Sequence, residues 1–218
     1  MAAALGALSL LAAALANAPD AASPPAPAVY SATPSDRGAR GHADASARQA
    51  VVTAAKAFGT AIAAAQATPG DDAAGLHAAA EPLLAHLDLP RITRLLLPHH
   101  WRTATETDRL ALEQALVEHL LARHAPALRQ LHDWRLELLP RQPPASDRAP
   151  TLAEVPVAIS ARGVSELRLT LRLSSTDDGW QLYDAALFGM SVVAMVRSSL
   201  PDLVADADTA GLIATGHR

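Results

Sequence analysis

The strongest pattern in this sequence is a stretch in which leucine alternates with polar residues without a fault. The leucines are Leu167, Leu169, Leu171 and Leu173, and the residues between them are Arg168, Thr170 and Arg172. Because successive side chains of a strand point to opposite faces, this alternation predicts a β-strand with one apolar and one polar face. Such a strand needs neighbours and a cover over its leucines, which indicates an antiparallel sheet with one buried face.

Three more segments have the same period. Residues 134–138 alternate, residues 155–161 alternate, and Asp178-Gly179 supplies a hairpin turn into residues 180–184. Four such strands in succession predict a four-stranded antiparallel sheet.

Helical spacing of apolar residues precedes and follows the strands. It covers residues 46–66, 72–86 and 90–97, and a long helix begins behind a capping box formed by Thr105 and Asp108. Residues 191–203 return to helix, with Ser191 as the N-cap. We therefore expect an α+β fold in which N-terminal helices pack on a curved four-stranded antiparallel sheet and a C-terminal helix closes it into a cone.

The N-terminal part of the chain has a different composition. Residues 1–16 form an apolar run that ends in an A-x-A-like site, which is typical of a secretory signal peptide, although no Lys or Arg precedes the run. Residues 17–45 are rich in Pro and Ala without a helical or strand period, so we expect a flexible linker there. Residues 46–218 then form a single domain.

Several classes of chemistry find no support in the sequence. The net charge is −4, from 18 basic and 22 acidic residues, so there is no basic excess for nucleic acid. The absence of cysteine excludes disulfides, zinc–cysteine modules and thiol nucleophiles. His119 and His124 are about 500° apart in helical rotation and do not share a face. We expect no catalytic residue, no metal and no cofactor.

The aliphatic faces of the strands and helices leave two interpretations open. They pack into a solid core, which is the commoner outcome, or they line a cavity for acyl chains, whose walls need no polar partners.

Two segments of the sequence carry a family resemblance. The first is L-P-R-I-T-R-L-L-L at residues 89–97, followed by W-R-T-A-T at residues 101–105. The second is G-W-Q-L-Y-D at residues 179–184, followed by G-M-S-V-V at residues 189–193 and R-S at residues 197–198. Together they resemble the signatures of the MlaC (toluene-tolerance) family. The sequence departs from the family pattern at Met195-Val196, at His124 and at Pro98-His99-His100.

The resemblance implies a fold like that of nuclear transport factor, and it also implies a function in lipid transport. Members of this family are secreted periplasmic proteins that carry phospholipid between membrane-bound transport complexes of the outer and inner membranes, with the acyl chains buried. The resemblance therefore implies a membrane lipid as ligand, and it leaves open a hopanoid-associated branch of the same fold. The residues that we expect to contact lipid are Ile92, Leu96, Leu116, Leu120, Leu167, Leu169, Leu171, Leu173, Tyr183, Val193 and Val196.

Two further functions remain as alternatives. A cavity enzyme of the isomerase or dehydratase type would need an acid or base in the cavity, and strand parity places Asp184 on the same face as Trp180 and Leu182. An interaction module without a cavity is the other alternative. We expect Asp184 to form an ion pair with Arg197 of the closing helix.

Overall fold

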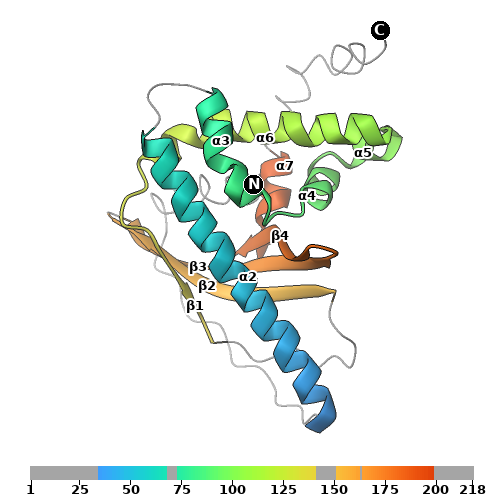
Figure 1. The fold of residues 1–218 in the computed structure, drawn as a ribbon, viewed down its shortest axis with the longest axis vertical. Coiled ribbons are helices and arrows are strands. Elements are labelled where there is room, and N and C mark those ends of the chain that lie inside the picture. The colour runs from blue at the N-terminus through green and yellow to red at the C-terminus, as the bar shows by residue number, and fades with distance from the viewer. Residues whose placement is uncertain (1–33, 68–72, 141–150, 163, 199–218) are drawn as a thin grey trace.

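The computed structural model describes residues 34–67, 73–140, 151–162 and 164–198. Helices come first, then the sheet, then one more helix, which confirms the α+β order (Figure 1). The helices are α2 (Pro34–Ala67), α3 (Ala73–Leu84), α4 (Leu89–Leu96), α5 (Pro98–Thr103), α6 (Glu106–Arg129) and α7 (Val192–Ser198). The strands are β1 (Arg135–Leu138), β2 (Leu152–Ala161), β3 (Val164–Thr176), β4 (Gly179–Leu187) and β5 (Met190–Ser191).

The first described helix is longer than the sequence pattern predicts. Residues 34–45 were expected to belong to the linker 17–45, but they are helical and continue without a break into the predicted helix. Figure 1 shows that this first part of α2 extends past the sheet. The predicted signal peptide, residues 17–33 of the linker and residues 199–203 of the last helix lie outside the described residues.

The sheet is open and antiparallel, with the strand order β1-β2-β3-β4-β5. It therefore has five strands rather than the four that the sequence predicts. The fifth pairs Met190 with Leu187 across a two-residue turn. Phe188 (φ 51°) and Gly189 (φ 79°) both have left-handed backbone conformations in that turn, as a type I′ hairpin requires. A strand of two residues behind a Phe-Gly turn has no alternation that a sequence pattern can detect. The cone-like closure stays a prediction.

The register of the central strands brings the apolar faces together. Leu171 of β3 lies opposite Val155 of β2 and Ala185 of β4. One irregularity follows: Arg172 pairs with Asp184 but Leu173 pairs with Leu182. The intervening residue of β4, Tyr183, has no partner on β3 and forms a β-bulge, which reverses the facing of side chains along β4.

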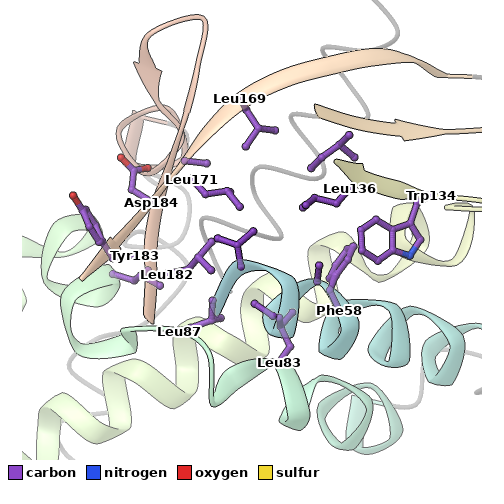
Figure 2. Close-up of a pocket in the computed structure, with 16 residues that line it drawn as sticks. Phe58, Leu83, Leu87, Trp134, Leu136, Leu169, Leu171, Leu182, Tyr183 and Asp184 are labelled. Atoms are coloured by element: carbon purple, nitrogen blue, oxygen red, sulfur yellow. The ribbon is translucent and has the colours of Figure 1, made fainter. Parts of the chain in front are cut away.

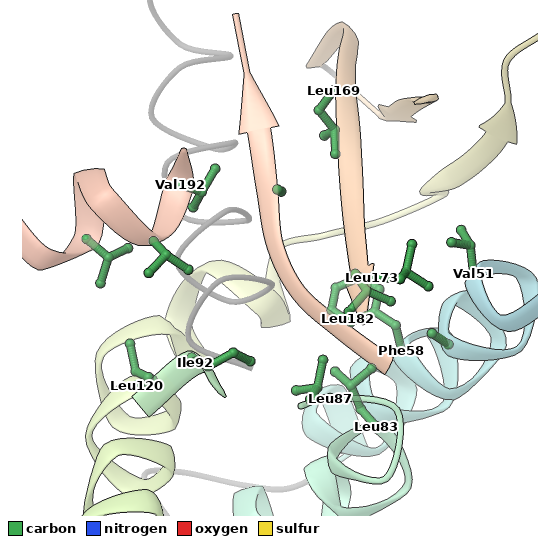
Figure 3. Packing of buried hydrophobic residues seen from close by; sticks show 14 of the residues in the cluster. Val51, Phe58, Leu83, Leu87, Ile92, Leu120, Leu169, Leu173, Leu182 and Val192 are labelled. Atoms are coloured by element: carbon green, nitrogen blue, oxygen red, sulfur yellow. The ribbon is translucent and has the colours of Figure 1, made fainter. Parts of the chain in front are cut away.

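The helices pack on the leucine face of the sheet and build one hydrophobic core with it. In Figure 1, α2 crosses the strands diagonally and α6 lies above them. Figure 3 shows the buried side chains of the core, among them Ile92 of α4, Leu120 of α6 and Val192 of α7 on one side of the view and Val51 of α2 on the other.

Local signals in the sequence explain where several helices begin. The predicted capping box is present: the Thr105 N–H donates to the Asp108 carboxylate (3.1 Å), and the Asp108 N–H donates to Thr105 Oγ1 (3.2 Å). Ser191 caps α7 by accepting the Ala194 N–H at 3.1 Å. Asp88 does the same for α4, where its carboxylate accepts the Arg91 N–H.

By length and composition alone, the segment His42–Ala67 of α2 is apolar enough to cross a membrane. In the structure one side of this segment, which includes Val51, Phe58 and Ile62, is buried in the core. The core helix of a globular domain fits these observations.

Candidate functional site: an apolar pocket between sheet and helices

A pocket with a volume of about 80 Å³ lies between the leucine face of the sheet and the helices. Figure 2 shows Leu169 and Leu171 of β3 directed toward Phe58 of α2 and toward Leu83 of α3. The sixteen lining residues are Val51, Ala54, Ala55, Phe58, Leu83, Leu87, Ile92, Trp134, Leu136, Ile159, Leu169, Leu171, Leu182, Tyr183, Asp184 and Ala185. All but Tyr183 and Asp184 have predominantly apolar side chains.

Leu171 marks the floor of the pocket. Its neighbours on both sides, Val155 and Ala185, are almost fully buried, yet Leu171 itself remains partly exposed in the middle of the sheet. A side chain in that position is exposed only because the layer above it is incomplete. The pocket is therefore a gap in the packing of helices on the sheet.

The helical wall explains the gap. Ala54 and Ala55 of α2 face the pocket with a single methyl group each, so they do not fill the distance to the strands. At one end, Phe58 and Trp134 close the wall with an edge-to-face contact between ring centroids 4.9 Å apart. Gly59 permits this arrangement, since a Cβ there would lie 3.3 Å from Cζ2 of Trp134.

Tyr183 and Asp184, the two polar residues of the lining, border the opposite end of the pocket, which we call its polar end (Figure 2). Asp184 is 4% exposed, and its carboxylate accepts the Val193 N–H at 3.0 Å and a hydrogen bond from Arg172 at 2.9 Å. The partner of Asp184 is thus Arg172 on the neighbouring strand, not Arg197 as expected. The bulge at Tyr183 is the reason, because it turns Asp184 to the face of Arg172 and away from that of Leu182.

The hydrogen bonds of Asp184 give it a structural role. Burial acts to lower the pKa of Arg172, but the hydrogen bonds and charges of Asp184 and Glu154 outweigh it and raise that pKa, so the guanidinium stays charged. The Asp184 carboxylate holds the first turn of α7 against β4. Each of its two oxygens already accepts a hydrogen bond, and this leaves the carboxylate poorly suited to act as a free base in the pocket.

Four of the eleven residues that the sequence predicts for lipid contact line the pocket: Ile92, Leu169, Leu171 and Tyr183. The other seven are buried in the hydrophobic core but are not part of the pocket wall: Leu96, Leu116, Leu120, Leu167, Leu173, Val193 and Val196. Lipid contact by any of the eleven stays a prediction.

Sequence reasoning missed the aromatic end and most of the helical wall. The sequence pattern places Phe58 in the helix 46–66 and Trp134 in the strand 134–138, but nothing in their spacing shows that they meet. In the structure Trp134 lies directly before β1. The alanine-rich composition of residues 46–66 was the available signal, because small side chains on a core-facing helix leave space opposite them.

The fold and the pocket together define a class of protein. An open sheet that is covered by helices and encloses an apolar pocket with one polar end is suited to bind an apolar or amphipathic molecule. Within the part of the chain that the structure describes, no group of three or more His, Asp or Glu side chains is arranged to hold a metal ion.

Comparison with known proteins gives the family. The family described as MlaC protein matches residues 53–215, which is more than half of the chain, and the chain therefore belongs to the MlaC family. The solved structure of a phospholipid-binding protein from Ralstonia solanacearum, in complex with a phospholipid, has a similar fold with a TM-score of 0.57. The two sequences are 18% identical, and the match covers 78% of this chain and 92% of that one. No curated protein matches the sequence.

Proposed function

We propose that this protein is a non-enzymatic periplasmic lipid carrier that holds the acyl chains of a phospholipid in the apolar pocket. The observation that carries the proposal is the pocket itself, whose walls are aliphatic and aromatic side chains from both the sheet and the helices. Membership of the MlaC family and the fold shared with a phospholipid-binding protein support the same conclusion.

The energetics favour such a pocket over a polar site. A diacyl lipid has about 30 methylenes, and exposing them to water costs on the order of 24 kcal/mol at roughly 0.8 kcal/mol each. A carrier must offset most of this free energy and still release its ligand. Apolar walls do both, because they contribute burial without directional bonds that would have to break at release.

The size of the pocket indicates that loading requires a structural change. A water-sized group needs about 10–15 Å³ of cavity volume, so a pocket of about 80 Å³ accommodates about five to eight groups of this size. This is about a quarter or less of the roughly 30 methylenes of a diacyl lipid. We infer that α2 and α3 move away from the sheet when the chains enter, because these helices and the segment that follows α3 provide most of the wall opposite the strands.

The proposal includes the location and the partners that the resemblance implies. The apolar residues 1–16 are consistent with export to the periplasm. A carrier there would exchange lipid with membrane-bound transport complexes of the outer and inner membranes.

Native mass spectrometry tests the proposal. The full chain is expressed with its N-terminal segment, recovered from the periplasmic fraction without detergent, and measured before and after organic extraction. We expect a mass above that of the polypeptide and a diacyl phospholipid in the extract. A polypeptide mass without extractable lipid, also after incubation with phospholipid vesicles, would contradict the proposal. A polycyclic lipid in the extract would favour the hopanoid-associated branch instead.

A further inference from the structure

Arg91 lies beside the polar end of the pocket. It belongs to the first turn of α4, and its guanidinium carbon is 4.0 Å from the centre of the Tyr183 ring. Tyr183 and the residue after Arg91, Ile92, both line the pocket. The stacking fixes the plane of the guanidinium, and the side chain is partly buried. A cation is therefore held in place next to the pocket wall.

The hydrogen-bonding capacity of this guanidinium is not used by the described residues. Nε of Arg91 is buried and has no hydrogen-bond partner among them. The carboxylate of Asp88 accepts the backbone N–H of Arg91 (3.1 Å) and the hydroxyl of Ser174 (2.5 Å). No ion pair within the described ranges involves the Arg91 side chain. A buried donor without an acceptor destabilises the fold, so its lack of a partner among the described residues favours an acceptor that a ligand supplies.

A second cation near this end of the pocket, Arg172, is already neutralised. Arg172 donates to Asp184 (2.9 Å) and to Glu154 (3.2 Å). Of these two arginines, Arg91 is the one with donors to offer, and a guanidinium binds the two oxygens of a phosphate with parallel hydrogen bonds.

We propose that Arg91 binds the phosphate of a lipid whose acyl chains occupy the pocket, so that the carrier selects phospholipids over uncharged lipids with the same chains. This inference rests on the proposed lipid-carrier function. Tyr183 has the role of a positioning residue, because its ring holds the guanidinium at the polar end of the pocket.

The test is a competition between two lipids that differ only in the phosphate-containing headgroup. Vesicles with equal amounts of dioleoylphosphatidylglycerol and dioleoylglycerol are incubated with the full chain, the protein is separated, and the retained lipids are quantified by mass spectrometry. The variants are Arg91→Gln and Arg91→Lys. Arg94→Gln is the matched control, since Arg94 is exposed on the same helix.

We expect the wild type and the Arg94→Gln variant to retain phosphatidylglycerol in preference to dioleoylglycerol. Arg91→Gln lowers this ratio by about tenfold or more, which corresponds to about 1.4 kcal/mol, and leaves dioleoylglycerol retention unchanged. Arg91→Lys gives an intermediate ratio, because it keeps the charge without the planar fork. If Arg91→Gln does not fold, as judged by circular dichroism, the test uses the ratio of phosphatidylglycerol to dioleoylglycerol that Arg91→Lys retains. A ratio below that of the wild type supports the inference, and an unchanged ratio refutes it.

Three results overturn the inference. A wild type that retains both lipids equally, or an Arg91→Gln variant with an unchanged ratio, refutes phosphate selection while the carrier function stands. A wild type that retains neither lipid refutes the carrier function and this inference with it. Inorganic phosphate is titrated separately and followed by ³¹P line broadening. Broadening that depends on Arg91, combined with an unchanged lipid ratio, assigns the site to free phosphate and not to a headgroup.

Discussion

Replacing Leu171 by tryptophan fills the pocket from the centre of the sheet. Tryptophan has about six more non-hydrogen atoms than leucine, and the pocket accommodates about five to eight water-sized groups, so the indole fits without moving the strands. Leu173 is the matched control on the same strand and the same face. It is 0% exposed and does not line the pocket, so no space is available for a larger side chain.

The two variants should separate stability from lipid binding. We expect Leu171→Trp to change the free energy of unfolding by no more than about 1 kcal/mol, since the strain of the larger side chain is offset by its burial. Leu173→Trp overpacks the core and should lower that free energy by about 1–3 kcal/mol. Urea denaturation followed by circular dichroism measures both values, and native mass spectrometry measures the retained lipid.

Lipid retention decides the result. Leu171→Trp should abolish retention of diacyl lipid in a protein that is folded and nearly as stable as the wild type. If Leu171→Trp folds and retains as much lipid as the wild type, the acyl chains bind elsewhere and the reasoning from the pocket is wrong. If Leu171→Trp is destabilised as much as Leu173→Trp, the gap above Leu171 does not accommodate a larger side chain, and the reasoning is wrong as well.

Three further outcomes follow from local interactions. Asp184→Ala should lower the free energy of unfolding by about 3–5 kcal/mol, because it leaves a charged arginine without its buried partner. Glu154→Ala, on the exposed side of the same network, should lower it by less than about 1 kcal/mol. Urea denaturation measures both values. Thr105→Ala removes the cap of α6 and should lower the same free energy by about 1 kcal/mol, measured in the same way. Burial, and then the charge of Arg123, lower the pKa of His119 in the folded state. The unfolded chain therefore binds more protons as the pH falls through 6.5, stability decreases in that direction, and His119→Gln should flatten this decrease in urea titrations between pH 7.5 and 5.

The sequence was most informative where structure depends on neighbouring residues. The alternation from Leu167 to Leu173 correctly predicted a strand with its leucines toward the helices, and the capping box at Thr105 correctly predicted the start of α6. Both are properties of a few consecutive residues, and the backbone geometry turns them directly into structure.

Features that depend on two distant segments were not predictable in this way. The bulge at Tyr183 arises because β3 and β4 pair with one extra residue on β4, and neither strand shows this by itself. One inserted residue reverses the direction of the side chains that follow it on the strand. For this reason the predicted ion-pair partner of Asp184, Arg197, was wrong. The contact between Phe58 and Trp134 likewise exists only after α2 has docked on the sheet.

The position of the pocket follows from the sizes of the side chains that each helix presents. The helices α4, α6 and α7 present long or branched residues to the core, such as Ile92, Leu116 and Val196, and their contacts are closely packed. The helix α2 presents Ala54 and Ala55 to the pocket, and their single methyl groups leave a gap between this part of α2 and the strands. The gap between helices and sheet therefore lies under α2, whereas α6 packs mainly on α2, α3 and α4. A lipid carrier built on this fold should open along α2, which is the side of the sheet where the pocket already lies.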